Sequence, residues 1–466
     1  MPARPGRANL TEPGGQQTNL INDSSGTVEN SLKKRPRIFY GWVILGVAII
    51  TIILGYTVRN TFSVFYPAVV EAFGWERGST ALMFSITILF YGLAAPAAGG
   101  LADRFGPRLV LPMGACIMGG GLILCSLART QWHFYLFYGV IAAVGLSIAG
   151  WTPLTTMISN WFVKKRGLAF GILAAAFGAS LPSAYAAQFL ISRFGWQTAY
   201  VIIGLASIII IVPLCAFFLR RSPQEKGLMP DGIPQTQHKA QAQDQPAGQT
   251  IRQRQWADTT WTLSGALRTY QFWLLFLISF CLMGFAEQTL VAHQVYFFKD
   301  AGYEPMTAAA IYSVFGIMYA IGKLCSFLSD HLGREMVFIP GCLLSTALAG
   351  LLFFIEDMHQ PWMPFLFAAC FGLAFGPTIP ILLTTVADLF QGRHFGSIQG
   401  VVMVGLSLGG AISPWLAGFL HDKTGSYSMT FFLLVVSLLV PAVLMWLVAP
   451  RKVRPVPGQR RRGLMG

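Results

Sequence analysis

The sequence predicts an all-α membrane protein with twelve transmembrane helices in two pseudo-symmetric six-helix bundles. Of the 466 residues, 54% are hydrophobic and only 11% are charged, whereas soluble domains carry about 25% charged residues. Apolar segments long enough to cross a bilayer, which takes about 20 residues, recur along the whole chain. Similar features also recur at a nearly constant spacing in its two halves.

Each apolar segment is continuously hydrophobic and lacks the alternation of polar and apolar residues that is typical of barrel strands, so we expect helices. Six segments precede the long polar stretch in the middle of the chain, and six follow it. They cover 40–70, 80–102, 107–128, 133–160, 167–191, 197–220, 270–298, 306–328, 336–356, 362–389, 395–421 and 427–449.

Polar segments set the expected domain organisation. The first 36 residues have no apolar core of a signal peptide, so we expect them to be a disordered tail rather than a cleaved leader. The middle stretch is rich in glutamine and has the composition of a linker. The expected parts are a cytoplasmic tail (1–36), a first six-helix bundle (37–221), a cytoplasmic linker (222–262), a second six-helix bundle (263–450) and a basic cytoplasmic tail (451–466).

The net charge of +14 is distributed as in a polytopic membrane protein. If the N-terminus is cytoplasmic, 26 of the 33 Lys and Arg residues fall in the tails, the linker and the turns on that side, and five fall on the other. This asymmetry predicts that both termini lie inside, which we expect to be the inner face of a bacterial cytoplasmic membrane. It explains the charge without a nucleic-acid partner, although the C-terminal arginines could also contact anionic lipid.

The sequence offers little support for catalysis or for a bound cofactor. The seven cysteines all lie in apolar spans and lack zinc-ligand spacing, so we expect packing residues and no metal. GLSLG (405–409) matches a serine-nucleophile motif but falls inside an expected helix, far from any histidine that could act as its base. No phosphate-binding loop of an ATP-driven pump is present. We therefore expect a protein that is not an enzyme, uses no cofactor and is driven by a gradient.

The two halves repeat each other. A shift of 227 residues superposes several charged residues, glycines and a proline of the first half on identical residues of the second, and shifts of 228 and 230 superpose two turns. The identical pairs are Asp103 and Asp330, Gly106 and Gly333, Gly145 and Gly372, Pro153 and Pro380, and Arg166 and Arg393. Two copies in the same orientation predict a substrate site between the halves, near the middle of the membrane.

Two loop motifs carry a family resemblance. GGLADRFGPR (99–108) resembles the signature between the second and third helices of the major facilitator superfamily, and SFLSDHLGRE (326–335) resembles its second copy. The resemblance implies the major facilitator fold and a conformational latch at the cytoplasmic helix ends. Because the second copy departs from the pattern at two positions, we expect a weaker latch there. The implied latch residues are Asp103, Arg104, Arg108, Asp330 and Arg334.

Five further segments resemble the monocarboxylate and oxalate/formate porters of that superfamily. They are YGWVIL (40–45), FGWERGSTALMFS (73–85), NWFVKKRGLAFGI (160–172), FGWQTAY (194–200) and HQVYFFKDAGY (293–303). Together they span nearly all of the membrane portion. The resemblance implies a small organic anion as substrate and transport by rocking of the two halves.

Arg59 lies in the middle of the first apolar span, where an unpaired charge costs about 3 kcal/mol or more. A shift of 228 residues maps it onto Glu287 in the seventh span. In one hypothesis Arg59 binds a substrate carboxylate with its planar fork, and Glu287 carries the coupled proton. In the other, the two residues form an ion pair that only holds the bundle together. A switch between these two states is a third possibility.

Other polar residues of the spans complete the expected site. Lys323 is shifted by one residue from the basic position of related porters, so it could bind substrate or extend toward the cytoplasmic edge. Asn60, Tyr66 and Tyr319 are expected to contribute amide and hydroxyl groups to substrate binding, although packing also explains such residues. His293 could relay protons, or it could be a packed, hydrogen-bonded histidine.

These observations predict a secondary transporter for a small organic monocarboxylate. Proton coupling is the preferred mechanism, with exchange for a counter-anion as the alternative. The absence of lysine from the eleventh span argues against a small dianion, for which relatives carry a second lysine there. An efflux carrier for an amphipathic compound and a membrane sensor or scaffold that transports nothing are the remaining alternatives. We expect a monomer in the lipid bilayer.

Overall fold

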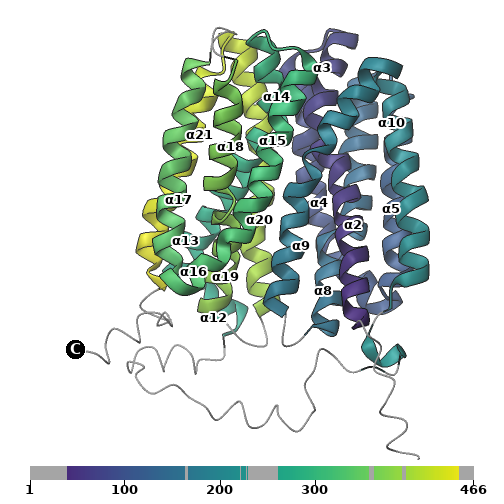
Figure 1. The fold of residues 1–466 in the computed structure, drawn as a ribbon, viewed down its shortest axis with the longest axis vertical. Coiled ribbons are helices and arrows are strands. Elements are labelled where there is room, and N and C mark those ends of the chain that lie inside the picture. Colours follow the sequence, from purple (N-terminus) through teal and green to yellow (C-terminus); the bar gives the residue numbers. More distant parts are fainter. Residues whose placement is uncertain are drawn as a thin grey trace, which may run out of the picture.

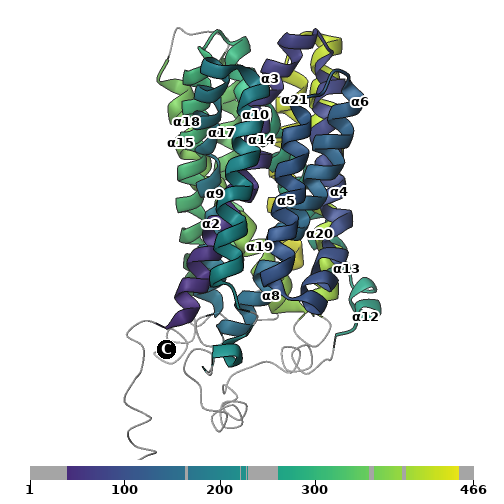
Figure 2. The same ribbon diagram turned by 90° about the vertical axis from the view of Figure 1, so that its right-hand side faces the viewer.

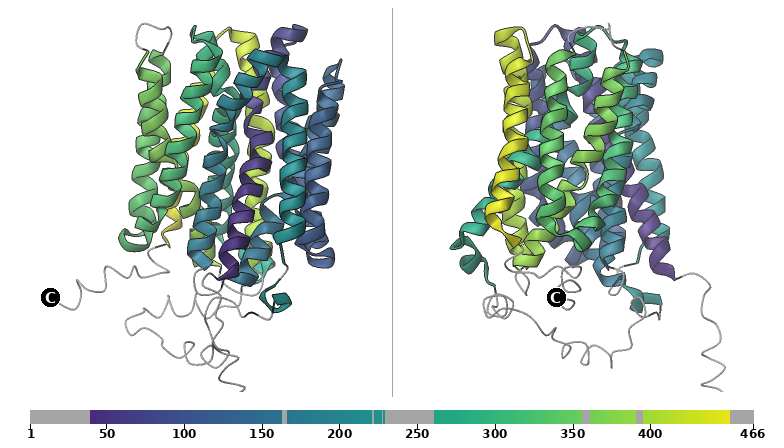
Figure 3. Two further views of the ribbon diagram at one scale, coloured as in Figure 1. Left: turned by 45° about the vertical axis from the view of Figure 1, so that its right-hand side comes forward. Right: turned by 60° about the vertical axis from the view of Figure 1, so that its left-hand side comes forward.

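The computed structural model is all-helical over the residues it describes, which are 39–162, 166–220, 222–226, 228, 261–355, 361–390 and 395–450. The expected tails and most of the expected linker lie outside these residues. The helices run along one common axis, as the views in Figures 1, 2 and 3 show. We call the face where α2 begins and α21 ends the terminal side, and the opposite face the distal side.

The helices of the first half lie together on one side of the molecule (Figure 1). They are α2 (Tyr40–Asn60), α3 (Phe62–Phe73), α4 (Arg77–Phe105), α5 (Pro107–Cys125), α6 (Gln131–Phe134), the π-helix η1 (Tyr135–Ala142), α7 (Ala143–Ala149), α8 (Trp151–Trp161), α9 (Arg166–Ser180), α10 (Ser183–Phe218) and the short 3-10 helix η2 (Pro223–Lys226).

The helices of the second half lie beside them. They are α12 (Leu263–Leu267), α13 (Tyr270–Ile278), the π-helix η3 (Ser279–Ala286), α14 (Glu287–Asp300), α15 (Pro305–Leu324), the 3-10 helix η4 (Cys325–Phe327), α16 (Leu328–Leu332), α17 (Arg334–Ala349), the 3-10 helix η5 (Gly350–Phe354), α18 (Met363–Phe375), α19 (Thr378–Leu389), α20 (Phe395–Thr424) and α21 (Ser428–Val448).

The described residues contain eleven helical stretches that are long and apolar enough to cross a membrane. One of them, 168–218, has 51 residues, more than twice the length that one crossing needs. It is broken at Gly195, whose positive φ of 80° reverses the chain. Counted as two passes, this stretch brings the total to the twelve spans that the sequence predicts.

The turns of the structure confirm the duplication. The described residues contain six glycines with positive φ, which form three pairs between the halves, and these angles favour glycine because it lacks a Cβ. The pairs are Gly74 and Gly302, Gly106 and Gly333, and Gly195 and Gly425, separated by 228, 227 and 230 residues. The same offsets align the two halves of the sequence, so the chain turns at equivalent points in both copies.

The two bundles pack most closely from the middle of the molecule to the distal side. Helix α4 of the first bundle packs along α20 of the second. A Cβ atom at Gly78 would lie only 2.9 Å from the backbone nitrogen of Phe419, and one at Gly418 would lie 2.8 Å from the Cα of Gly78. The helix backbones therefore touch here, where only glycine leaves room.

Substitution of Gly418 tests this contact. We expect Gly418→Val to push α20 away from α4 on the distal side, because a side chain overlaps the facing backbone. The purified variant should unfold several degrees below the wild-type protein in a thermal melt, since about 1 kcal/mol moves the midpoint by a few degrees. Gly46→Val is the control, because among the described residues no heavy atom outside the local helix backbone lies within 4 Å of a Cβ at that position. An equal loss of stability in both variants would contradict the contact.

Candidate functional site

Three ionisable side chains approach one another in the middle of the helical bundle. Arg59 lies at the end of α2, Glu287 at the start of α14 and Lys323 near the end of α15. All three are buried, with exposed fractions of 4%, 5% and 6%. The first comes from one bundle and the other two from its partner, so the site spans the interface that the repeat predicts.

The guanidinium of Arg59 donates a hydrogen bond to the amide oxygen Oε1 of Gln288, which is fully buried on α14. Three aromatic rings also surround this cation at 5.4 to 5.9 Å from their centroids, those of Tyr56, Phe84 and Phe177. Such rings attract a cation through their quadrupoles but leave its charge in place. The Nε atom of Arg59 has no hydrogen-bond partner among the described residues.

The carboxylate of Glu287 is hydrogen-bonded to a residue other than Arg59. The hydroxyl of Tyr319 donates to its Oε1 atom at 2.6 Å, and Tyr319 is fully buried. The structure thus brings together three residues of the predicted site, Glu287, Tyr319 and Lys323. It does not form the direct ion pair between Arg59 and Glu287 that one hypothesis requires, because the guanidinium turns to the neighbouring Gln288 instead.

Lys323 points inward rather than toward the terminal edge of the bundle. Its Nζ atom lies 4.1 Å from the ring centroid of Tyr319 and 4.2 Å from that of Phe177. The ring of Phe177 therefore lies close to both Lys323 and Arg59. Lys323 is also within electrostatic reach of Glu287 and Arg59. This geometry favours a role at the central site over an extended, lipid-edge lysine.

Asn60 follows Arg59 and contacts α9, the helix that carries Phe177. Its Nδ2 atom donates to the hydroxyl oxygen of Ser180 at 2.7 Å, and that hydroxyl donates to the carbonyl oxygen of Phe177 at 2.6 Å. Because the Ser180 proton is used, this oxygen can only accept from Asn60, which fixes the orientation of the amide. The Oδ1 atom of Asn60 then remains a buried acceptor with no donor among the described residues.

Irregular helix geometry positions these groups. Helix α2 ends at Asn60 and α3 begins after Thr61, so the break falls beside Arg59. On the other bundle, the π-helix η3 ends at Ala286, directly before Glu287. Such π-helical turns often occur at functional sites because they rotate the residues that follow. Both partners of the interface therefore depart from ideal α-helix at the site.

Tyr66 and His293 lie away from these groups, near the distal side. Tyr66 donates to the carbonyl oxygen of Arg77 at 3.0 Å. His293 is within 2.8 Å of the carbonyl oxygen of Pro414 through Nε2 and within 3.2 Å of the Tyr427 hydroxyl through Nδ1. Because a carbonyl only accepts, Nε2 carries a proton, and Nδ1 of the neutral ring accepts from Tyr427. Burial raises the pKa of Tyr427, so its phenol keeps the donated proton.

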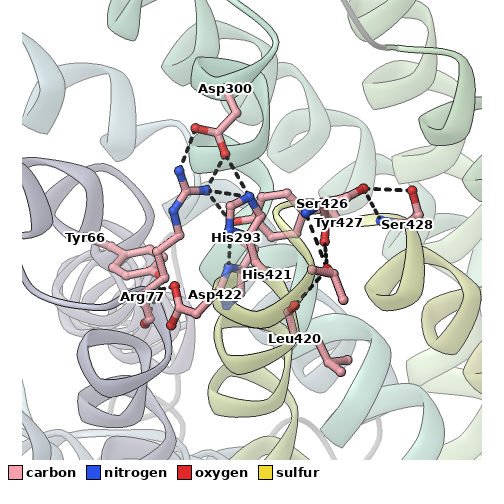
Figure 4. Close-up of polar contacts among 11 residues, drawn as sticks. Tyr66, Arg77, His293, Asp300, Leu420, His421, Asp422, Ser426, Tyr427 and Ser428 are labelled. Atoms are coloured by element: carbon pink, nitrogen blue, oxygen red, sulfur yellow. Dashed lines mark hydrogen bonds and ion pairs between the residues drawn. The ribbon is translucent and has the colours of Figure 1, made fainter.

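A polar cluster joins the two bundles on the distal side (Figure 4). We call it the distal seal and define it as Arg77, Asp300, His421, Asp422 and Tyr427. Arg77 at the start of α4 forms two hydrogen bonds with the carboxylate of Asp300 at the end of α14, one of them 2.9 Å long. The His421 ring lies within 3.7 Å of the same carboxylate. A second ion pair, between Lys299 and Glu71, lies nearby and is more exposed.

Asp422 adds a helix cap to the distal seal. Its carboxylate accepts from the backbone N–H groups of Arg77 and Gly78, at 3.1 and 2.6 Å. These are the first amides of α4, which have no partner within the helix and lie at its positive end. An acid at the end of α20 in one bundle therefore caps a helix of the other bundle.

The expected latch residues that the structure describes make contacts within their own bundles on the terminal side. Arg334 pairs with Asp330 at 2.7 Å and with Asp388 of α19 at 3.0 Å. Arg108 donates to the carbonyl oxygen of Ala216 at 2.7 Å, and Arg104 lies over the ring of Phe105. The side chain of Asp103 is outside the described part of the structure.

Several groups of the site were not identified from the sequence. Gln288 follows Glu287 in a short polar run, Glu-Gln-Thr, which was the only signal for its position. The distal seal joins the ends of α4, α14 and α20 with the turn before α21, which are far apart in the sequence. Charged residues at span ends usually face water, so nothing in the sequence pairs Arg77 with Asp300.

A family model described as Major Facilitator Superfamily matches residues 48–386 and 324–464. The chain belongs to the major facilitator superfamily. It is similar to monocarboxylate transporter 13 of Rattus norvegicus, with 24% identity over 84% of this chain and 85% of the relative. It is also similar to monocarboxylate transporter 11 of Mus musculus, with 27% identity over 84% and 83%, and to the uncharacterized MFS-type transporter YcxA of Bacillus subtilis, with 26% identity over 83% and 90%.

A solved structure supports the same fold. The bacterial homolog of the human lysosomal transporter Spinster, in an inward-facing and unoccupied conformation, matches with a TM-score of 0.62 and 17% identity, over 90% of this chain and 97% of that one. This major facilitator protein is thus a multi-pass membrane transporter that resembles the monocarboxylate group. These relatives are transporters rather than enzymes, in line with the expectation from the sequence.

Proposed function

We propose that this major facilitator protein transports a small organic monocarboxylate by alternating access. The observation that carries the proposal is the charge balance of the buried site. Arg59 and Lys323 contribute two positive charges and an ionised Glu287 contributes one negative charge, which leaves one positive charge without a fixed counter-ion among the described residues. While Glu287 is ionised, a monoanion would neutralise this site, whereas a dianion would leave it with one negative charge. The names of the similar monocarboxylate transporters support the same substrate class.

The positions of the polar groups suit a carboxylate. The Nε donor of Arg59 has no partner in the described part of the structure, and a guanidinium binds carboxylate oxygens through parallel N–H groups. Lys323 could approach the same anion from the second bundle, across the ring of Phe177. An anion bound by residues of both bundles would lose its contacts with one bundle as the two halves rock apart. Binding would therefore be coupled to the change in which side of the membrane the site opens to.

We further propose that the distal seal is the closed gate of this state. The terminal side would be the cytoplasmic side, because the lysines and arginines of the sequence collect there. The membrane would be the cytoplasmic membrane of a bacterium. Opening toward the distal side would break the contacts of Arg77 with Asp300 and of α4 with Asp422.

Uptake into proteoliposomes tests the proposed function. Purified protein is reconstituted and supplied with radiolabelled lactate, pyruvate or formate, with and without an inward proton gradient. We expect saturable uptake of at least one acid, stimulated by the gradient. Uptake only by exchange with internal anion would favour the exchanger. No uptake of any acid, together with transport of an amphipathic compound, would favour the efflux carrier, for which the aromatic rings around Arg59 would form the binding surface.

Glu287 is the proposed proton carrier, since it is the acidic member of the three charged residues that the described structure brings together at the site. We expect Glu287→Gln to lower gradient-driven lactate uptake about ten-fold, because no proton can be released there, and to change exchange of internal for external lactate less than about two-fold. Tyr319→Phe is the matched control, because it removes the hydrogen bond of 2.6 Å and keeps the carboxyl group. Full gradient-driven uptake by Glu287→Gln would exclude this role.

The Oδ1 atom of Asn60, which accepts from no donor in the described structure, predicts a preference among monocarboxylates. A 2-hydroxy acid bound at Arg59 could donate its hydroxyl to Oδ1, whereas a 2-keto acid has no such donor. We expect Asn60→Leu to lower the ratio of lactate to pyruvate transport about five-fold, as loss of one hydrogen bond of about 1 kcal/mol predicts. The measurement is the competition of the two unlabelled acids against labelled lactate. An unchanged ratio with normal total uptake would place Asn60 outside the substrate site.

A further inference from the structure

The neutral partner of Arg59 is the unusual feature of the central site. A buried guanidinium is usually paired with a carboxylate, and one is available on the preceding residue of α14. Instead, Arg59 donates to the amide of Gln288, while Glu287 accepts from Tyr319. Two adjacent side chains of nearly equal shape thus differ in charge, and the uncharged one contacts the cation.

The amide of Gln288 is held in one orientation. Its Nε2 atom donates at 2.9 Å to the carbonyl oxygen of Met283, which lies in the π-helix η3. Since a carbonyl cannot donate, the amide nitrogen must face Met283 and the oxygen must face Arg59. Gln288 is also fully buried, so water does not compete for either contact.

We propose that Gln288 is a positioning and specificity-determining residue that orients the Arg59 guanidinium without neutralising it. It thereby keeps the charge of Arg59 available for the carboxylate of the substrate. This inference rests on the proposed function. An acid at position 288 would form a permanent ion pair with Arg59 and compete with the carboxylate of the substrate. An apolar residue would leave Arg59 charged but would not hold its guanidinium in one orientation.

Substitutions at position 288 separate charge from shape. Gln288→Glu changes one heavy atom and adds a negative charge beside Arg59, and Gln288→Met keeps the length of the side chain but removes the acceptor. Gln294→Glu is the matched control, because it adds the same acid to the same helix at a similarly buried position. The measurements are the KM and maximal rate of lactate, pyruvate and formate uptake at pH 7 and pH 5, and the infrared absorption of the new carboxyl group in purified protein.

We expect Gln288→Glu to raise KM on the order of ten-fold at pH 7 relative to the wild-type protein, as loss of about one charge-assisted contact predicts. The ratio of the KM of Gln288→Glu to that of the wild-type protein should be smaller at pH 5, because a protonated glutamic acid carries no charge and resembles glutamine. Gln288→Met should raise KM less, and Gln294→Glu should not reproduce the pH-dependent change of the ratio. A merely structural role of Gln288 would affect the amount of folded protein but not this pH dependence.

Two results would overturn the inference. One is a KM of Gln288→Glu within two-fold of an active wild-type protein at pH 7. The other is an infrared spectrum in which the new carboxyl group is protonated at pH 7, since it would then form no ion pair with Arg59. The spectrum decides the point even if the wild-type protein transports none of the three acids, which would instead refute the proposed function. An ionised carboxylate in that case would support the inferred link between Gln288 and Arg59.

Discussion

Replacing Arg59 by glutamine is expected to abolish uptake of the monocarboxylate while leaving the protein folded. The substitution removes the Nε donor, which has no partner among the residues that the structure describes. It also removes the positive charge that the proposed function assigns to the substrate carboxylate. Loss of a buried, charge-assisted contact of about 3 kcal/mol lowers binding roughly 100-fold. The initial rate of lactate uptake into proteoliposomes, divided by the amount of reconstituted protein, measures the effect.

Two further variants identify the cause. Arg59→Lys keeps the charge but loses the planar fork, so we expect an intermediate loss of uptake. Arg193→Gln removes an exposed arginine at a distal turn and should leave uptake unchanged. If Arg59→Gln instead keeps its uptake and unfolds at a lower temperature than the wild-type protein, Arg59 serves the packing of the bundle and the proposed binding role is wrong.

Much of the fold follows from the sequence because the bilayer constrains it strongly. A span needs about 20 apolar residues with all backbone groups paired, and the apolar runs lack the alternation of barrel strands, so each of them predicts a helix. The constant offsets between Asp103 and Asp330 and between Gly106 and Gly333 indicated the duplication. The structure shows why the glycines recur, since Gly106 and Gly333 both adopt positive φ at the same turn.

The partners of Arg59 could not be predicted in the same way. Adjacent residues on a helix point about 100° apart, so whether Arg59 meets Glu287 or Gln288 depends on the rotation of α14. That rotation is set by the π-helix η3, which an analysis based on 3.6 residues per turn does not detect. Distance along a helix likewise separates His293 from Glu287, because six residues correspond to about 9 Å.

The distal seal was inaccessible to sequence analysis for another reason. Its contacts depend on which bundle faces are together in one conformational state, and a sequence does not specify a single state. Arg77 and Asp300 each lie at the end of a span, and only their juxtaposition across the bundles suggests the proposed role as a gate. Predictions for these residues therefore concern the balance between states rather than the affinity of the central site.

Breaking the distal seal is expected to open the distal side of the transporter. The pair of Arg77 and Asp300 is partly buried, with 18% and 31% of the side chains exposed, so its loss should cost on the order of 1 to 2 kcal/mol. If the state that is open toward the distal side becomes more stable by this free energy relative to the closed state, its population rises roughly ten-fold. The assay places a cysteine at Ser63 and adds a membrane-impermeant maleimide to the distal side. We expect Asp300→Asn to speed labelling of this cysteine roughly ten-fold. Ser63 is fully buried on α3, between Arg59 and Tyr66.

The same assay distinguishes a specific gate from a general loss of surface charge. Lys299→Gln breaks the neighbouring ion pair between Lys299 and Glu71. This pair also joins the bundles, but the side chain of Glu71 is 61% exposed. We therefore expect less than about a two-fold change in labelling. Arg77→Gln should have at least the effect of Asp300→Asn, because it also removes the contacts of Arg77 with His421 and with the ring of Tyr296. The double variant should add little to Arg77→Gln, because both single changes remove the shared contact between Arg77 and Asp300. Additive effects of Arg77→Gln and Asp300→Asn would show that the two residues act separately, and equal labelling of Lys299→Gln would show that any distal charge suffices. A coupled effect restricted to Arg77 and Asp300 would instead mean that opening of the distal side requires separation of this pair.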